Sequence, residues 1–234
     1  MLIILDGTEG GGKSTIIEAW KNYLTEQGKS IFDLKKYWKE AKQHPSYSEL
    51  KSCDFVFGYE PTGVGIGQVV RNELIQKDNN YAPQAIAEGY SLDRLIFYTK
   101  IVIPALADNK CVILDRGITT SIAYQSMQEG LSMEKVANLV GNQLALKHHP
   151  DHLIIADISP EKAMNRLNAR TDKKDDAIFE KLDFMKKLDK QYHSQEYRSF
   201  IEKFDIKIHY LSTDLEIDIM KQEAVDLLKK LISA

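Results

Sequence analysis

The sequence contains little of what marks several classes of protein. Only two cysteines occur, Cys53 and Cys111, and they match no metal-ligand spacing, which predicts reduced thiols in a cytoplasmic protein. A net charge of −3 over 234 residues gives no overall attraction to nucleic acid, so any phosphate binding should be local. No apolar run is long enough to cross a membrane, and neither a signal peptide nor an internal repeat is evident. With 43% hydrophobic residues, the chain can bury the core of a single α/β domain over residues 1–234.

A glycine-rich loop near the N-terminus is the strongest motif. Met1 to Leu5 form an apolar run that is too short for a helix and predicts a strand. The loop that follows reads Gly7-Thr8-Glu9-Gly10-Gly11-Gly12-Lys13-Ser14-Thr15, with the spacing G-x-x-x-x-G-K-[ST]. Apolar residues then recur at helical spacing from about Lys13 to Gln27, before Gly28 as a predicted C-cap. Strand, loop and helix in this order are the context of a phosphate-binding loop.

The residue types in this loop suit ATP and Mg²⁺. Backbone N–H groups can turn inward around phosphates only with dihedral angles that side chains disfavour, which explains the four glycines. Lys13 is expected to reach the β- and γ-phosphates and Ser14 to ligate Mg²⁺, while the helix N-terminus adds partial positive charge. The predicted ATP-binding residues are Gly7, Gly10, Gly11, Gly12, Lys13, Ser14 and Thr15.

Glu9 is unexpected within such a loop, because a carboxylate repels a nucleotide. Its side chain either lies solvated on the outer rim or points away from ATP to accept a hydrogen bond from a second substrate, such as a sugar hydroxyl. The loop alone leaves both interpretations open.

Strands and helices alternate along the rest of the chain. Ser30 to Leu34 predicts a strand, and the basic-aromatic segment Lys35 to Ser52 indicates an amphipathic excursion over the surface rather than a nucleic-acid face. A long helix from about Ala82 to Asp108 is expected to kink at Pro104. The other predicted elements are the strand Cys53 to Tyr59, a helix carrying Val69 to Ile75, the strand Lys110 to Leu114, a helix starting at Thr119, the helix Leu131 to Lys147, the strand His152 to Ile158, a helix after Ser159-Pro160, a helix through Phe184 to Tyr192, the strand Ile206 to Leu211 and the helix Leu215 to Ile232. This alternation predicts a three-layer α/β P-loop fold with a parallel sheet flanked by helices.

Polar residues gather after the predicted strands, where open α/β sheets bind ligands. Glu60 begins a Pro- and Gly-containing loop, and Asp115 occupies a Walker-B position, where a carboxylate holds Mg²⁺. Arg116 beside it would face the phosphates. Tyr90 and Arg94 share one helix face and form either an aromatic under a surface arginine or a base-stacking ring beside a base-binding guanidinium.

The sequence alone leaves the roles of two other charged positions open. Arg71 lies on the helix after this loop and is either a solvated charge or a ligand-binding group. The charged segment Thr171 to Asp176 follows Arg166 and Arg170, and it suits a solvated loop or a mobile lid that carries arginine onto phosphates.

Together these motifs resemble the thymidylate kinase family over nearly the whole chain. The resemblance rests on the glycine-rich loop, Glu60 to Gly63 with Gly67 and Arg71, Tyr90 to Arg94, Asp115-Arg116 with Ser121 and Ala123 to Gln125, Pro150 to Leu153, and Arg166 to Arg170. It implies an enzyme that phosphorylates dTMP with MgATP, and a homodimer formed through the long helices.

The resemblance also implies roles for individual residues. Glu9 would contact the acceptor's 3′-hydroxyl, Tyr90 would stack on thymine and Arg94 would bind a base carbonyl. Arg71 and Arg116 would grip the acceptor phosphate. The other implied acceptor-site residues are Glu60, Ser121 and Tyr124, of which the last two would line the base and exclude a ribose.

A catalytic set and a metal site follow from the same resemblance and the loop motif. In a lid at about residues 166–180, Arg166 and Arg170 would stabilise the transferring phosphoryl group, as in the bacterial type. The predicted catalytic residues are Lys13, Arg116, Arg166 and Arg170, and the predicted Mg²⁺ ligands are Ser14 and Asp115.

The chain departs from the family pattern at four places. Tyr59 precedes Glu-Pro where the family usually has arginine, and Gly117 follows Asp-Arg where an aromatic residue is frequent. The lid reads Asp176-Ala177 where Asp-Arg is common, and residues 35–52 look like an insertion. These departures bear on the choice of base more than on phosphoryl transfer.

Other function classes are considered beside this one. A kinase for another deoxynucleoside monophosphate or for a deoxynucleoside is the nearest alternative, and the latter would need a base, for which Glu60 is best placed. A regulatory ATP-binding module or GTPase switch is a second class, but the Asn-Lys-x-Asp motif of a GTPase does not occur. An inactive nucleotide-binding protein is disfavoured by the intact Lys13, Ser14, Asp115 and Arg116.

Overall fold

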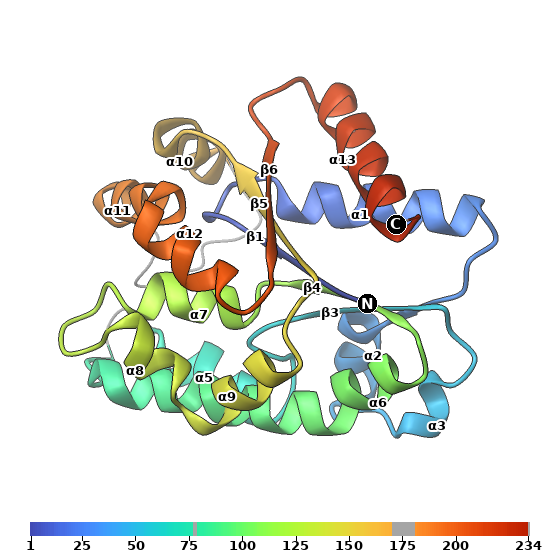
Figure 1. Cartoon of the computed structure of the whole chain (residues 1–234), viewed down its shortest axis with the longest axis horizontal. Coiled ribbons are helices and arrows are strands. Elements are labelled where there is room, and N and C mark those ends of the chain that lie inside the picture. Colours follow the sequence, from blue (N-terminus) through green and yellow to red (C-terminus); the bar gives the residue numbers. More distant parts are fainter. Residues whose placement is uncertain (77–78, 170–180, 234) are drawn as a thin grey trace.

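The computed structural model describes residues 1–76, 79–169 and 181–233 and has three layers (Figure 1). The strands are β1 (Leu2–Asp6), β2 (Ile31–Asp33), β3 (Phe55–Tyr59), β4 (Cys111–Asp115), β5 (His152–Asp157) and β6 (Lys207–Ser212). They form a six-stranded sheet in the order β2-β3-β4-β1-β5-β6, and every pairing is parallel. The predicted α/β fold class is therefore confirmed.

Helices cover both faces of this sheet. They are α1 (Lys13–Glu26), α2 (Leu34–Ala41), α3 (Tyr47–Leu50), α4 (Ile66–Val69), α5 (Pro83–Phe97), α6 (Ile103–Ala107), α7 (Ile118–Gln125), α8 (Met133–Ala137), α9 (Val140–Lys147), α10 (Pro160–Asn168), α11 (Leu182–His193), α12 (Gln195–Glu202) and α13 (Ile217–Ile232). In the part of the chain that the structure describes, no helix combines the length and apolarity needed to cross a bilayer.

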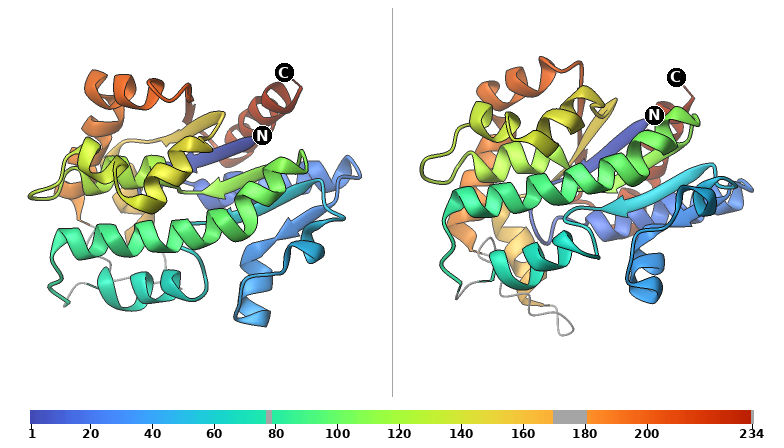
Figure 2. Two further views of the ribbon diagram at one scale, coloured as in Figure 1. Left: turned by 60° about the horizontal axis from the view of Figure 1, so that its bottom comes forward. Right: turned by 90° about the horizontal axis from the view of Figure 1, so that it is seen from below.

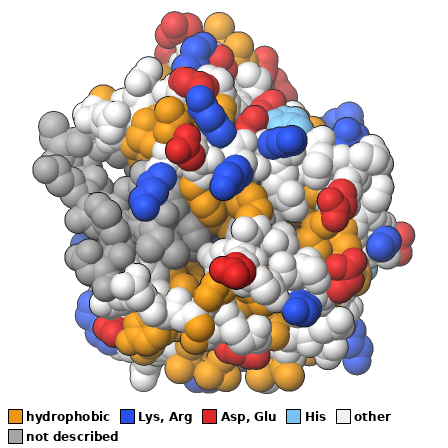
Figure 3. Space-filling view, turned by 90° about the vertical axis from the view of Figure 1, so that its left-hand side faces the viewer, with side chains coloured by type: hydrophobic (Ala, Val, Ile, Leu, Met, Phe, Trp, Pro, Cys, Tyr) orange, Lys and Arg blue, Asp and Glu red, His pale blue; other side chains and the backbone are white. Residues whose placement is uncertain are grey.

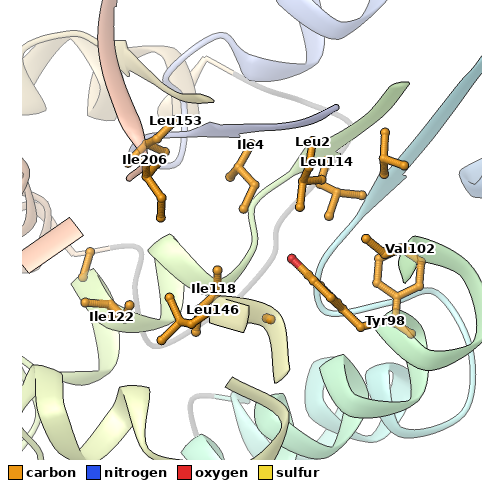
Figure 4. Close-up of a cluster of buried hydrophobic side chains, with 14 of the residues drawn as sticks. Leu2, Ile4, Tyr98, Val102, Leu114, Ile118, Ile122, Leu146, Leu153 and Ile206 are labelled. Carbon is orange, nitrogen blue, oxygen red and sulfur yellow. The ribbon is translucent and has the colours of Figure 1, made fainter. Parts of the chain in front are cut away.

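Strand β1 lies at the centre of the sheet and is buried on both faces. On one face Ile3 and Leu5 pack with Trp20 of α1 and with α13. On the other face Leu2 and Ile4 point toward a cluster that includes residues of α7, α9 and the helix after α5 (Figure 4). This alternation of direction along a continuous apolar run is what a central parallel strand requires.

The carboxyl ends of the strands meet at one edge of the sheet, which lies at the left of Figure 1. Leu5 of β1 and Tyr59 of β3 are both in register with Asp115 of β4. The chain moves from β1 to one side of the sheet and later returns to β5 on the other side, so this edge is a topological switch point. The loops after β1, β3 and β4 are consequently brought together there.

Residues 34–50 form an amphipathic segment that lies on the surface and packs its apolar side onto the core. This segment forms α2 and α3, and Trp38 is only 1% exposed. Figure 2 shows these two helices beside the second half of the long helix that α5 begins. This agrees with the predicted amphipathic excursion over the surface: Leu34, Trp38 and Leu50 pack into the main cluster. Lys36, Lys39 and Glu40 on the other side stay exposed.

One helix prediction needs correction, and one helix was not predicted. The segment predicted as one helix from Leu131 to Lys147 is broken into α8 and α9, because Leu139 adopts an extended conformation with ψ 142°. The sequence carries no Gly or Pro at this break, so no local signal marks it. Helix α12 was not predicted. It follows α11, which agrees with the helix predicted through Phe184 to Tyr192, and Ser194 caps it by accepting from the Tyr197 N–H at 3.1 Å.

The helix from Pro83 to Ala107 is continuous and contains a wider turn. A π-helical turn at Tyr98–Val102 comes just before Pro104. Pro104, which is expected to cause a kink, has no N–H to donate to the preceding turn. The wider turn accommodates it within the helix.

Helices α5 and α9 cross at very close range, and this contact generates the first prediction. A Cβ at Gly141 of α9 would lie 1.8 Å from the carbonyl oxygen of Ser91. We expect Gly141→Ala to destabilise the fold by about 2–3 kcal/mol through overpacking. Urea or thermal unfolding measures this loss.

The matched control for that variant is Gly28→Ala. Gly28 has φ 70°, but no atom lies within 4 Å of the position that its Cβ would take, so only backbone strain of about 1 kcal/mol is expected. Equal losses for the two variants would contradict the close approach of α5 and α9.

Candidate active site

The glycine-rich loop wraps around the carboxyl end of β1. Gly10 and Gly12 have φ values of 72° and 83°, which side chains disfavour, and a Cβ on Gly10 would lie 2.4 Å from the Ala163 carbonyl oxygen. Lys13 is buried, and its Nζ donates to the carbonyl oxygens of Gly7 at 3.1 Å and Thr8 at 2.7 Å. Burial and the nearby charge of Arg116 lower the pKa of Lys13. Ser14 lies exposed in the first turn of α1.

Asp6 anchors this loop from below. It ends β1, has no exposed surface, and its carboxylate accepts hydrogen bonds from several elements. The donors are the Gly7 N–H at 2.8 Å, the hydroxyls of Thr119 at 3.2 Å, Thr120 at 2.8 Å and Tyr192 at 2.7 Å, and Arg116 Nη1 at 3.5 Å. One carboxylate thus joins the loop to the start of α7 and to α11.

Asp115 ends the neighbouring strand β4 at the same level of the sheet. Its Oδ1 is buried and has no hydrogen-bond partner among the described residues. Burial raises the pKa of Asp115, while the charges of Lys13 and Arg116 act in the opposite direction. A buried carboxylate oxygen without a partner is costly unless a cation or a donor completes it.

Arg116 and Glu9 form an ion pair beside the loop. Arg116 has φ 68° and its Nη2 donates to Glu9 Oε1 at 2.6 Å, while its Nη1 donates to the Tyr124 hydroxyl at 3.0 Å. Burial opposes ionisation of Glu9, but the charges of Arg116, Lys13 and Arg71 lower its pKa to about 2. Glu9 therefore points toward Arg116 and is paired with it, while 36% of its side-chain surface stays exposed.

Arg94 lies in a buried polar network rather than on the surface. It is 1% exposed, and its Nε donates to Glu60 Oε2 at 2.8 Å while Nη2 donates to Ser121 Oγ at 2.9 Å. Its Nη1 donates to the side chain of Asn142, which is itself fully buried on α9. Burial raises the pKa of Glu60 to about 7, and Arg94 opposes this shift. The interpretation of Arg94 as a surface arginine is therefore wrong.

Arg71 is held against the loop that follows β3. Its Nε and Nη2 donate to the Pro61 carbonyl oxygen at 2.9 and 2.6 Å, and its guanidinium lies 4.7 Å from the ring centre of Tyr59. Tyr90 is close enough to feel the same charges: burial raises its pKa to about 12, against the influence of Arg71 and Arg116. Arg71 is thus not a solvated charge.

Arg166 belongs to the part of the predicted lid that the structure describes, and its side chain reaches the glycine-rich loop. Its Nη2 donates to the Thr213 carbonyl oxygen at 2.8 Å, and its Nη1 would lie 3.7 Å from a Cβ on Gly12. Arg170 and the rest of the predicted lid to residue 180 lie outside the described residues.

Sequence reasoning did not single out Asp6, Tyr192 or Asn142. A signal for Asp6 was available, because both β1 and β4 end in Leu-Asp and only the second aspartate was considered. Tyr192 and Asn142 carry no comparable local signal, since they reach the site through the packing of α11 and α9.

The molecular surface around this site carries basic, acidic and hydrophobic side chains together. Figure 3 views the molecule from that side, and lysine and arginine side chains are interspersed there with acidic and hydrophobic ones. The face that this view shows has no extended patch of one sign. Positive charge is instead concentrated in the site itself, on Lys13, Arg71 and Arg116.

A parallel sheet with a glycine-rich loop and a buried lysine after β1, and with Arg116 beside that loop, is typical of a P-loop phosphotransferase. The family model described as thymidylate kinase matches residues 46–224. The chain therefore belongs to the thymidylate kinase family.

Individual proteins show the same relationship. The thymidylate kinase of Clostridium novyi is 28% identical over 231 residues, covering 97% of each chain, and that of Thermoanaerobacter sp. strain X514 is 29% identical over 97% of each chain. That of Aster yellows witches'-broom phytoplasma is 33% identical over 82% of this chain and 81% of the other. A crystal structure of thymidylate kinase from Ehrlichia chaffeensis shares the fold, with a TM-score of 0.63 at 22% identity and 98% of both chains covered.

The Asp6 network yields a prediction about stability. In Asp6→Asn one acceptor oxygen becomes an NH₂ group that faces donors, so we expect a loss of about 3 kcal/mol in the free energy of unfolding. For a chain of this length that corresponds to a fall in Tm of roughly 6–12 °C. Calorimetry or urea unfolding measures it.

Asp214→Asn is the control, because Asp214 forms an exposed pair with Lys162 at 2.6 Å and should cost less than about 1 kcal/mol. An Asp6→Asn protein as stable as Asp214→Asn would show that the network around β1 does not support the fold.

Proposed function

We propose that this protein transfers the γ-phosphoryl group of MgATP to the 5′-phosphate of dTMP, giving dTDP and ADP. The observation that supports this most is that Glu9, Arg71, Tyr90 and Arg116 come from four places in the sequence yet lie close enough for their charges to act on one another. The named thymidylate kinases that match this chain over 97% of its length support the same reaction.

The donor side of the site fits MgATP. The left-handed glycines let the loop turn its backbone N–H groups toward phosphates, and Asp115 Oδ1, which has no partner among the described residues, suits a cation. Ser14 and Asp115 would hold Mg²⁺, which would neutralise charge on the phosphates. Lys13 would exchange its bonds to Gly7 and Thr8 for phosphate oxygens.

The acceptor side needs positioning more than acid–base chemistry. Since a monophosphate is already a nucleophile at neutral pH, the protein must align it and neutralise charge. Arg71 and Arg116 would bind its phosphate, Glu9 its 3′-hydroxyl, and Tyr90 would stack on thymine. Tyr124, whose hydroxyl is bonded to Arg116, would line the pocket beside the sugar.

Arg94 suits a fixed contact with the base. A guanidinium has five N–H groups, of which four are donated to Glu60, Asn142 and Ser121. The remaining Nη1 hydrogen would go to a carbonyl oxygen of thymine. Ser121 would exclude a ribose from the same pocket.

Arg166 would add positive charge from the side of α10, next to the loop at Gly12. Arg170 remains a prediction for the same role, as does the lid over residues 166–180. In the proposed arrangement the chain is one kinase domain over residues 1–234 and acts in the cytoplasm.

A deoxynucleoside kinase is the second candidate, and the state of Glu60 favours it. A pKa of about 7 and an Oε1 that no described residue contacts by a hydrogen bond suit a general base for a 5′-hydroxyl. Glu60 is, however, only 3% exposed and its other oxygen is bound to Arg94, so a substrate reaches it less readily than it reaches Glu9.

ADP release from MgATP with a panel of acceptors tests these alternatives. We expect turnover with dTMP, weak turnover with dUMP, none with dGMP, dCMP, dAMP or thymidine, and loss of activity on adding EDTA. In Lys13→Ala, turnover should fall at least about hundredfold, because a preorganised contact to the transition state is removed. Such a fall would show that the measured activity does not come from a contaminating kinase.

Each other outcome has a definite meaning. Turnover of thymidine would favour Glu60 as a base and the deoxynucleoside kinase. Preference for another monophosphate would retain the phosphate-binding residues and overturn the base pocket. Hydrolysis indifferent to every acceptor would contradict a kinase altogether.

We also propose a homodimer formed through the face of α5. Leu92 and Ile96 lie four residues apart on α5 and are 46% and 36% exposed, and Val140 of the adjoining α9 is 68% exposed. Hydrophobic side chains gather along the lower edge of Figure 3, the side on which α5 lies in Figure 1. Exposed apolar side chains that cluster on packed helices are typical of an interface.

Analytical ultracentrifugation tests the dimer. The unsubstituted protein should sediment as a dimer, and Leu92→Glu with Ile96→Glu should give a monomer, because charge is then buried at the contact. Ile219→Glu on α13, where the native side chain is 53% exposed, is the control and should remain dimeric. A monomeric unsubstituted protein at tens of micromolar would refute the interface.

A further inference from the structure

Arg71 is held in two directions by groups that carry no charge. The Pro61 carbonyl oxygen receives its Nε and Nη2, and the ring of Tyr59 lies under its guanidinium plane at 4.7 Å. Among the residues that the structure describes, none accepts a hydrogen bond from Nη1. The guanidinium is therefore fixed in orientation while one edge stays available.

This arrangement differs from that of Arg116. Arg116 is paired with the carboxylate of Glu9 at 2.6 Å, which offsets part of its charge. An aromatic ring attracts a cation through its face and leaves the N–H groups and the net charge of the guanidinium free. Burial raises the pKa of Tyr59, so this ring stays neutral at physiological pH.

Tyr59 is itself supported by the segment that resembles an insertion. Trp38 of α2 packs its ring edge-on against Tyr59, with centroids 5.1 Å apart and planes at 85°. Trp38 also contacts Phe97 of α5 at 5.7 Å, so the support extends to the core. The backbone at Gly63 lies against the hydroxyl end of Tyr59 and against Trp38, since a Cβ there would come within 3.2 Å of the Trp38 ring and closer still to the Tyr59 hydroxyl.

We propose that Tyr59 is a positioning residue that holds the guanidinium of Arg71 ready for the phosphate of the acceptor nucleotide, and that Trp38 of α2 keeps the Tyr59 ring in place. This inference rests on the proposed function, because the phosphate-binding role of Arg71 belongs to it. Residues 34–50 thereby contribute to acceptor binding without touching the acceptor.

The physical reason is preorganisation. An arginine side chain has several rotatable bonds, and ordering it only when the substrate arrives weakens binding. Stacking on Tyr59 orders the side chain beforehand. Loss of the ring should therefore weaken the binding of a phosphate-bearing acceptor but not of the corresponding nucleoside.

Isothermal titration with dTMP and with thymidine, combined with steady-state kinetics, tests this. In Tyr59→Leu the Kd and KM for dTMP should rise about 3- to 20-fold, the range expected for a lost cation–π contact, while thymidine binding and the KM for ATP stay unchanged. Tyr59→Phe keeps the ring and should behave like the unsubstituted protein. Trp38→Phe should show a smaller change with the same selectivity for dTMP.

Tyr23→Leu is the matched control, because Tyr23 also carries a cation over its ring, Lys229 at 5.1 Å, but lies on α1 away from the acceptor residues. It should leave dTMP binding unchanged. If Tyr59→Leu fails to fold, Tyr59→Met is the variant to test instead, because methionine fills a similar space and has no aromatic face.

Equal weakening for dTMP and thymidine, or a Tyr59→Phe protein as impaired as Tyr59→Leu, would overturn the inference. Unchanged dTMP binding in a folded Tyr59→Leu protein would also overturn it. The panel of acceptors, measured with the unsubstituted protein, tests the proposed function separately. A failure of the positioning role of Tyr59 is therefore distinguishable from a failure of the proposed function.

Discussion

A single buried carboxylate, that of Asp6, is the constraint on which the site depends. It has no exposed surface, and it is stabilised because the loop, α7 and α11 all turn donors toward it and the Arg116 guanidinium lies close by. An unsatisfied buried carboxylate would cost several kcal/mol, so these elements are not free to move independently. The position of the glycine-rich loop relative to Arg116 follows from this, since Arg116 extends from the neighbouring strand into the same space, 3.5 Å from Asp6.

Around this centre, the chain places its positive charges by three different means. Arg94 is paired with buried Glu60 and is rigid, Arg116 is paired with half-exposed Glu9, and Arg71 is stacked on Tyr59 without an acidic partner. A buried pair suits a group that must not move, because breaking it leaves a charge uncompensated. A stacked arginine retains its charge for an incoming anion. Each arrangement thus agrees with the role proposed for the residue: base binding for Arg94, and phosphate binding for Arg116 and Arg71.

The fold could be predicted in large part from local patterns. The loop motif, the apolar strands and the helical spacing of α1 predict the parallel α/β architecture, because these signals are carried by neighbouring residues. The break between α8 and α9 was missed, because Leu139 turns so that Gly141 can approach α5 and Asn142 can reach Arg94. The burial of Trp38 was missed for the same kind of reason: its partners Tyr59 and Phe97 are distant in sequence.

The sequence by itself determined the class of chemistry. The spacing of the glycines, Lys13 and Ser14 is a local property that binds phosphate wherever a strand and helix flank it. Which carboxylate and which arginine meet there was decided only by the tertiary structure. Glu9 faces Arg116, Glu60 faces Arg94 and Tyr59 faces Arg71 because parallel register brings the ends of β1, β3 and β4 to one edge, and side-chain pairing across that edge depends on distances that no single stretch of sequence contains.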